Sequence, residues 1–215
     1  MSRTRIKFCG ITREVDAELA VSLDAWAIGM ILWPGSPRAV TVDQAAMLAA
    51  PLKRRAEVVG VFVNPTLDEV TRAADAIGLT LIQLHGDEGP VFCGEVARRT
   101  GCQVIKAARV RSSSDVQALG AYRTALHLLD SYVPGVVGGS GETFAWELAV
   151  EALRYKRPLI LSGGLTPANV AAAIAAVHPY AVDVASGVEA SPGVKDHALM
   201  REFADAVAAT AEVTA

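Results

Sequence analysis

The chain has 215 residues, of which 52% are hydrophobic, 20% charged and only 6% aromatic. This length allows one domain with a large core, and a net charge of −3 without a basic stripe argues against a nucleic-acid surface. Three widely spaced cysteines without a CxxC pair predict neither a disulfide framework nor a zinc site.

Short apolar runs alternate with longer amphipathic runs along the whole chain. The short runs predict strands at Arg5–Cys9, Ala25–Leu32, Glu57–Val63, Leu79–Leu84, Gln103–Ala107, Ala125–Asp130, Pro158–Ser162 and Ala181–Ala185. The longer runs predict helices at Arg13–Leu23, Thr41–Ala49, Thr66–Ala76, Asp87–Arg98, Ser112–Tyr122, Trp146–Arg154, Thr166–Ala175 and His197–Ala211. These eight strand–helix units predict an α/β fold, a single-domain (β/α)8 TIM barrel over residues 1–215, rather than an open doubly wound sheet.

Several helix starts carry capping residues. Thr66 and Ser112 are hydroxyl residues followed by acids within one turn, which is typical of N-caps. Thr166 stands directly before Pro167, and this pair predicts a cap followed by a proline in the first turn. In a barrel of this kind, functional residues are expected at the carboxyl ends of the strands or just after them.

Glycine-bearing segments follow the last three predicted strands. They contain Gly139 and Gly141, then Gly163 and Gly164, then Ser186 and Gly187. Glycines let the backbone approach an anion and aim N–H groups at it, and in this fold the loops after strands seven and eight commonly hold phosphate. Ordinary turns are the alternative, but two such loops on adjacent strands favour a phosphorylated small-molecule ligand. The loop after strand six could also act as a lid.

Two side chains that can move protons end predicted strands. Cys9 ends the first strand and Asp130 the sixth, so both should face the barrel mouth from opposite sides. That geometry suits a base on one face of a substrate and an acid on the other. The alternatives are that Cys9 is a small buried hydrophobe and that Asp130 caps a loop.

Four more polar residues fall near strand ends. The planar fork of Arg38 matches a substrate carboxylate, although an arginine in such a position, taken alone, is more often a surface residue. His85 and Asp183 could bind sugar hydroxyls, or could instead cap a helix and join a buried polar network. Lys106 could add positive potential at the mouth or reach outward to solvent.

Other features bear on location and on metals. The first residues lack the apolar core of a signal peptide, and no stretch is long and apolar enough to span a bilayer, so a cytoplasmic protein that does not associate with membranes is expected. The four histidines are scattered without ligand spacing, so no metal is expected. A monomer and a homodimer are both open, because a barrel helix can pack on solvent or on a second copy.

The chain resembles the phosphoribosylanthranilate isomerases, barrel enzymes of tryptophan biosynthesis, over nearly its whole length. The resemblance rests on short motifs in a fixed order: Lys7-Phe8-Cys9-Gly10-Ile11-Thr12, Ser36-Pro37-Arg38, Gly60-Val61-Phe62-Val63-Asn64, Gln83-Leu84-His85-Gly86, Leu129-Asp130-Ser131, Gly138-Gly139-Ser140-Gly141, Ser162-Gly163-Gly164-Leu165 and Asp183 through Glu189.

The resemblance implies an Amadori rearrangement of N-(5′-phosphoribosyl)anthranilate without any cofactor. It implies that Asp130 is the general acid that opens the ribose ring to a Schiff base, and that the Cys9 thiolate then removes the C2′ proton. It further implies that Arg38 holds the anthranilate carboxylate, with His85 and Asp183 near the sugar hydroxyls.

Some positions depart from the family pattern. Ala145 stands where the family usually has Asp or Asn before a tryptophan, Ala185 where a serine or asparagine is common, and Gly29 through Trp33 lack the usual phenylalanines. Two other functions stay open. A sister isomerase of histidine biosynthesis acts on an aminoimidazole ribotide, but it has an aspartate where Cys9 stands. A non-catalytic phosphate-binding barrel would be expected to lose one of the two proton-transfer groups.

Overall fold

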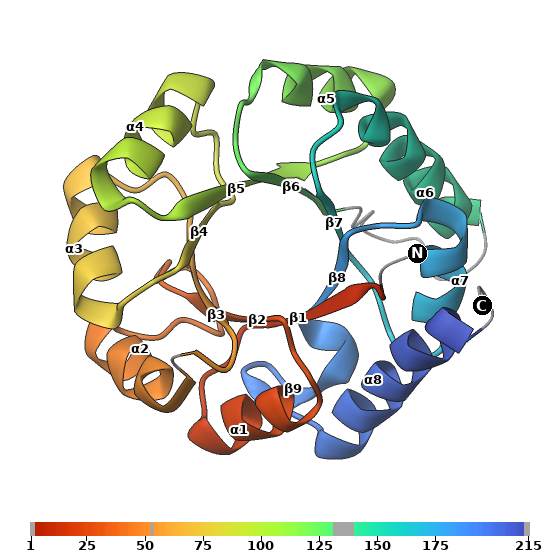
Figure 1. Cartoon of the computed structure of the whole chain (residues 1–215), viewed down its shortest axis with the longest axis horizontal. Coiled ribbons are helices and arrows are strands. Elements are labelled where there is room, and N and C mark those ends of the chain that lie inside the picture. The colour runs from red at the N-terminus through yellow and green to blue at the C-terminus, as the bar shows by residue number, and fades with distance from the viewer. Residues whose placement is uncertain (1–2, 53, 131–139, 213–215) are drawn as a thin grey trace.

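The predicted barrel is present. The computed structural model describes residues 3–52, 54–130 and 140–212, with residues 140–145 and 211–212 described by their backbone alone. In this part of the chain, parallel strands close into a barrel in the order β1 to β8, and helices surround it (Figure 1). The strands are β1 (Arg5–Cys9), β2 (Ala27–Ile31), β3 (Glu57–Phe62), β4 (Leu81–Leu84), β5 (Gln103–Arg109), β6 (Leu126–Asp130), β7 (Leu159–Ser162) and β8 (Ala181–Val184). The ring closes where β1 pairs with β8, with Lys7 opposite Asp183.

The helices follow the strands as predicted. They are α1 (Glu14–Ser22), α2 (Val42–Ala49), α3 (Leu67–Ile77), α4 (Pro90–Thr100), α5 (Ser113–Ala118), α6 (Ser140–Ala152), α7 (Val170–Val177) and α8 (His197–Glu212). Thr66 caps α3 as expected: its hydroxyl accepts from the Glu69 N–H, and the Glu69 carboxylate accepts from the Thr66 N–H. α5 is shorter than predicted because its last turn is the 3₁₀ segment η2 (Leu119–Ala121).

Three helix starts differ from the predictions. α4 begins at Pro90, three residues after the predicted Asp87. α6 begins six residues before Trp146. α7 begins at Val170, so the predicted cap at Thr166 is wrong. The Asn169 side chain explains the late start, because its Oδ1 accepts from the Thr166 N–H at 2.8 Å and its Nδ2 donates to the Gly164 carbonyl at 3.1 Å. These bonds fold residues 164–169 into a turn in front of the helix.

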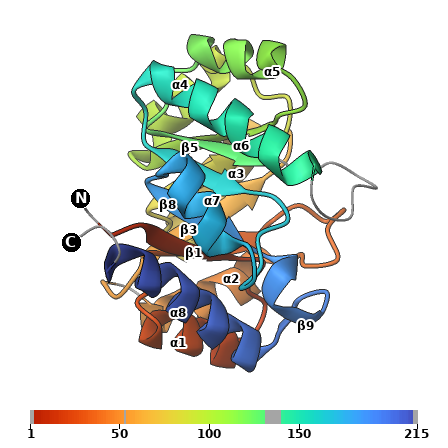
Figure 2. The ribbon, with the colours of Figure 1, turned by 90° about the vertical axis from the view of Figure 1, so that its right-hand side faces the viewer.

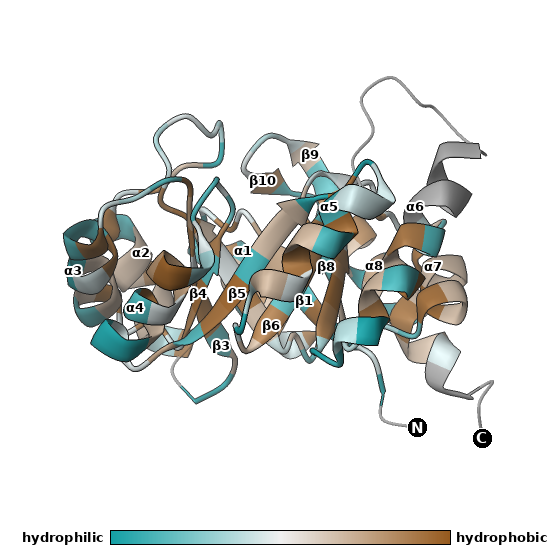
Figure 3. Cartoon of the chain, turned by 90° about the horizontal axis from the view of Figure 1, so that it is seen from above, coloured by the Kyte–Doolittle hydropathy of each residue, from teal (hydrophilic) through white to brown (hydrophobic). Residues whose placement is uncertain are grey.

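Hydrophobic residues form two layers of core. The larger lies between the strands and the helices, and the smaller fills the inside of the barrel with residues such as Val59, Ile105 and Ile160. Figure 3 shows the strands as largely hydrophobic. Because strand side chains alternate, every second one points inward, and the last inward positions open at the carboxyl ends of the strands.

A short hairpin after β8 was not predicted. β9 (Glu189–Ser191) pairs antiparallel with β10 (Val194–Lys195), and Gly193 has φ +80° in the turn between them. Figure 2 shows β9 at the same end of the molecule as the start of α6. The 3₁₀ turn η4 (Ser186–Val188) joins the hairpin to β8. Among the described residues no helix is both long and apolar enough to cross a membrane.

Candidate active site

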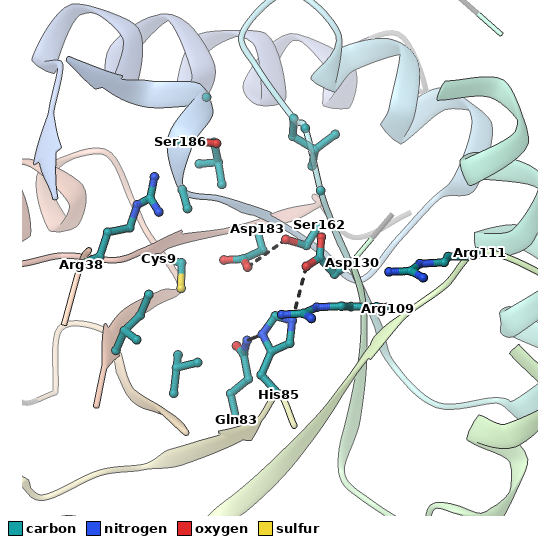
Figure 4. A pocket seen from close by; sticks show the side chains of 18 residues that line it. Cys9, Arg38, Gln83, His85, Arg109, Arg111, Asp130, Ser162, Asp183 and Ser186 are labelled. Atoms are coloured by element: carbon teal, nitrogen blue, oxygen red, sulfur yellow. Dashed lines mark hydrogen bonds and ion pairs between the residues drawn. The ribbon is translucent and has the colours of Figure 1, made fainter. Parts of the chain in front are cut away.

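A cavity of about 470 Å³ opens at the carboxyl ends of the strands. Its lining brings together all five catalytic and substrate-binding candidates from the sequence: Cys9, Arg38, His85, Asp130 and Asp183. Figure 4 shows these side chains directed towards one shared space. The glycine loops after β7 and β8 line the same cavity. Residues more than a hundred positions apart in the chain therefore meet at one site.

Cys9 lies inside the barrel, 6% exposed, with Gly29 opposite it on β2. A Cβ at position 29 would lie 2.9 Å from the Cys9 sulfur and 3.1 Å from the Lys7 Nζ, so a side chain there would displace both groups. Burial raises the pKa of the Cys9 thiol, and the positive charge of Lys7 offsets part of the rise. The structure places Cys9 as a buried thiol at the cavity wall.

Asp130 ends β6 beside His85, whose Nε2 lies 3.4 Å from the Asp130 Oδ2. The Gln83 side-chain amide lies 3.1 Å from the His85 Nδ1 and holds the ring with its Nε2 towards Asp130. His85 does not cap the next helix, the other role considered for it, because the N-cap of α4 is Gly89. Gln83, which the sequence did not single out as functional, fixes the ring.

Asp183 is both a buried network residue and part of the cavity wall. Its Oδ1 accepts from the Lys7 ammonium at 2.9 Å, and its Oδ2 accepts from the Ser162 hydroxyl at 3.1 Å. The Lys7 side chain is fully buried. A buried ion pair is stable only with such close geometry, because both charges lose their hydration. The network fixes the carboxylate at the cavity wall.

Arg38 is already paired in the described chain. Its Nε and Nη2 donate to the carboxylate of Glu189 at 2.6 to 3.0 Å, and the Lys195 Nζ donates to the same carboxylate at 2.9 Å. Arg38 and Lys195 lower the pKa of Glu189, against the effect of burial. Gly10, with φ +73°, leaves room for the arginine, because a Cβ there would lie 2.7 Å from the Arg38 Cδ. The unpredicted hairpin thus orients a predicted site residue.

The glycine loops after β7 and β8 pack against each other at the cavity edge. Gly163 and Gly164 have φ of +93° and +65°, a conformation that favours glycine. A Cβ at Gly187 would collide with the Leu165 carbonyl oxygen. Ser186 also lines the cavity. Of the loop after β6, Gly139 lies outside the described residues, and Gly141 falls in the first turn of α6.

Lys106 takes neither of its predicted places. On β5 its neighbours Ile105 and Ala107 face the barrel interior, so Lys106 points to the helix layer. There its Nζ donates to the Glu88 carboxylate and to the Gly86 carbonyl, both at 2.7 Å. The side chain is only 5% exposed, so it neither lines the mouth nor reaches solvent.

Sequence reasoning also missed two cationic side chains of the cavity, Arg109 and Arg111. Arg109 is the last residue of β5 and pairs in register with Asp130. The signal that identified Asp130, a polar residue at the end of an apolar strand, was available for Arg109. It was overlooked because the fifth strand was predicted to end at Ala107.

Comparisons with known proteins agree on one family. The family model of N-(5′-phosphoribosyl)anthranilate isomerase matches residues 6–206. The isomerase of that name from Pseudomonas fluorescens is 50% identical over 209 residues, 96% of this chain and 100% of the relative. The crystal structure of phosphoribosyl anthranilate isomerase from Thermotoga maritima superposes with a TM-score of 0.88 at 40% identity, covering 96% of this chain and 99% of that chain. A crystal structure of such an isomerase with reduced 1-(o-carboxyphenylamino)-1-deoxyribulose 5-phosphate gives a TM-score of 0.86 at 36% identity, with the same coverage. The chain belongs to the N-(5′-phosphoribosyl)anthranilate isomerase family.

Proposed function

We propose that the chain performs the aldose–ketose isomerisation of its family on N-(5′-phosphoribosyl)anthranilate, with Asp130 as general acid and Cys9 as general base. One observation carries the assignment of roles: a carboxyl group and a thiol from β6 and β1 line one cavity, whose edge carries the glycine loops and Arg38. Proton transfer by two placed groups is what an Amadori rearrangement requires.

The protein exchanges only protons with the substrate, whose own bonds rearrange. Asp130 gives its proton to the ribose ring oxygen, the C1′–O bond breaks, and the anthranilate nitrogen forms a Schiff base with C1′. The Cys9 thiolate then removes the C2′ proton, and the electron pair of the C–H bond neutralises the iminium as an enolamine. The enolamine tautomerises to the ketone. C1′ is reduced as C2′ is oxidised, so no external oxidant or reductant is consumed, and proton exchange with solvent returns Asp130 and Cys9 to their starting forms.

The substrate would lie across the cavity. Its phosphate would bind at Gly163, Gly164 and the Ser186–Gly187 turn, where backbone N–H groups can approach an anion. Arg38 would bind the anthranilate carboxylate through the guanidinium nitrogen that Glu189 leaves open. The ribose would then lie between Cys9 and Asp130, within reach of His85 and Asp183.

Turnover is the direct test. Purified protein should convert freshly prepared N-(5′-phosphoribosyl)anthranilate, followed as the loss of anthranilate fluorescence. An aminoimidazole ribotide of the histidine pathway serves as the comparison substrate. Turnover no faster than the spontaneous decay of N-(5′-phosphoribosyl)anthranilate would refute the assignment.

Gly187→Ala should weaken substrate binding. The added methyl meets a backbone carbonyl, which cannot turn away as a flexible side chain can, so the two phosphate loops must separate. We expect KM to rise about ten- to hundredfold, since each hydrogen bond to a charged group contributes about 1.5–3 kcal/mol. Gly94→Ala in α4 is the matched control, because its new methyl meets nothing within 4 Å. An unchanged KM for Gly187→Ala would exclude these loops as the phosphate site.

Glu189→Gln should also raise KM, by about tenfold, which corresponds to one charge-assisted hydrogen bond. The neutral amide no longer holds Arg38 in a fixed orientation and leaves the buried Lys195 without its carboxylate. Glu18→Gln is the matched control, since Glu18 pairs with Arg55 on the surface. Steady-state kinetics decide the point: a KM equal to that of the unmodified chain contradicts the positioning of Arg38 by Glu189.

A further inference from the structure

One buried charge in the barrel lies next to the proposed base, and the reaction steps above do not use it. Lys7 and Cys9 are two residues apart on β1, so both side chains point into the barrel. Lys7 is fully buried. Lysine is rarely buried to this extent unless it is paired. Here the buried ammonium lies beside the Cys9 thiol.

The neighbouring strands bring the ammonium and the thiol together. β2 presents Gly29 opposite Cys9, and the absent side chain leaves space that the Cys9 sulfur and the Lys7 Nζ share. β8 presents Asp183 opposite Lys7, and its Oδ1 accepts one of the three ammonium protons at 2.9 Å. The remaining protons of Lys7 are available to the sulfur, and a hydrogen bond between the Lys7 and Cys9 side chains contributes to the pKa of both groups.

Charged side chains from several elements surround Cys9. They are Lys7 on β1, Asp183 on β8, Lys195 on β10 and Arg38 in the segment after β2. Lys195 and Arg38 are both bound to Glu189. Lys7 is bound to Asp183, so these five groups carry three positive and two negative charges, a net charge of +1 beside the protonated thiol.

We propose that Lys7 is a positioning residue that stabilises Cys9 as a thiolate by holding an ammonium beside it inside the barrel. This inference rests on the proposed role of Cys9 as the base. An ammonium in a site shielded from water interacts with a thiolate much more strongly than it does in bulk water. Asp183 acts in the opposite sense, because its negative charge both occupies Lys7 and repels the thiolate. Lys7 therefore increases the fraction of Cys9 that is thiolate, and Asp183 decreases it.

Two electrostatic effects support this reading. Burial by itself would lower the pKa of Lys7, yet Asp183 and Cys9 raise it above the ordinary value, so the ammonium form is retained. Burial raises the pKa of Cys9, Lys7 and Lys195 lower it, and Asp183 raises it further. Burial disfavours the thiolate form of Cys9, and the charge of Lys7 counteracts this effect.

The test measures the thiol directly, without turnover. Iodoacetamide alkylation of Cys9 is followed across pH by mass spectrometry of its peptide, in the unmodified chain and in Lys7→Met and Asp183→Asn. Lys7→Met should move the midpoint of Cys9 alkylation up by about one pH unit or more, and Asp183→Asn should move it down; one unit is a tenfold change in thiolate at a fixed pH below the midpoint. Cys102, half-buried and bonded to the Leu79 carbonyl, is the internal control in the same digest.

The opposite signs separate positioning from a structural role. A general loosening of the barrel would expose the thiol and shift Cys9 the same way in both variants, and this would overturn the proposal, as would an unmoved midpoint in Lys7→Met. If Lys7→Met does not fold, the double variant Lys7→Met/Asp183→Asn removes both charges at once, and its midpoint should lie above that of Asp183→Asn alone. An equal midpoint in these two would likewise overturn the proposal.

The proposed function can fail separately. If Cys9→Ser remained fully active, Cys9 would not be the base, whatever its alkylation profile. If Cys9→Ser were inactive while the Lys7→Met midpoint stayed in place, the base would stand and the positioning role of Lys7 would be refuted.

Discussion

Asp130→Asn should lower kcat by about 10²- to 10⁴-fold, the usual contribution of a placed general acid. An amide of nearly the same shape cannot deliver a proton to the ribose ring oxygen, so ring opening becomes the slow step. Stopped-flow or steady-state loss of anthranilate fluorescence measures the effect. KM should change little, because Asp130 acts on the reacting centre rather than on the phosphate or the carboxylate.

Two controls separate loss of the acid from loss of the fold. Asp75→Asn removes an exposed carboxylate on α3, away from the cavity lining, and should leave kcat unchanged. The Asp130→Asn variant should still bind reduced 1-(o-carboxyphenylamino)-1-deoxyribulose 5-phosphate, the compound bound in a related crystal structure. A kcat within threefold of the unmodified chain, with binding intact, would show that another group supplies the proton.

The sequence could predict the barrel because its signals are local. Each strand is a short apolar run and each helix an amphipathic one, and eight such units without a break favour closure into a barrel over an open sheet. The ends of β1 and β6 then indicated Cys9 and Asp130, since the last inward side chain of a strand reaches the mouth.

The contacts that tune the site were not predictable in this way. The partner of Lys7 is 176 positions away, and that of Arg38 is 151 positions away. No local pattern reports such pairs. Glu189 and Lys195 lie in strands of three and two residues, too short to show alternation. The two-residue spacing from Cys9 indicates that Lys7 faces inward, but it does not identify the Asp183 carboxylate as its partner.

The start of α7 shows the limit of local signals. Thr166 and Pro167 fit a cap and a first turn, but the Asn169 side chain bonds back to Thr166 and to Gly164 and delays the helix. This turn begins at Gly164, which lines the cavity together with Gly163. The departure from simple capping therefore falls at the proposed phosphate loop, where the backbone shape matters most.

Cys9→Ser should be the second variant with a very large loss, again about 10²- to 10⁴-fold in kcat. A hydroxyl in the same place is far less acidic than a thiol, so almost none of it is ionised near neutral pH. Cys102→Ser is the matched control, since Cys102 bonds to the Leu79 carbonyl and is not among the residues that line the cavity. Retention of more than a tenth of the activity by Cys9→Ser would exclude the thiolate as the base.

The pH profile gives the same assignment an independent check. Only the thiolate removes the C2′ proton, and burial raises the pKa of Cys9 above its ordinary value. Asp130 must keep its proton while Cys9 loses its own, so the active form of the unmodified chain follows the product of two ionisations, and its kcat/KM should be bell-shaped with pH. In Asp130→Asn the acid no longer titrates, so the residual kcat/KM should rise about tenfold per pH unit below the pKa of Cys9 and level off only in alkaline solution. The double variant Asp130→Asn/Cys9→Asp should lose this rise, because a carboxylate at position 9 would be largely ionised at lower pH than the thiol. A residual kcat/KM of Asp130→Asn that is flat through the neutral range would mean that the base is already ionised there, and would contradict a buried thiol in that role.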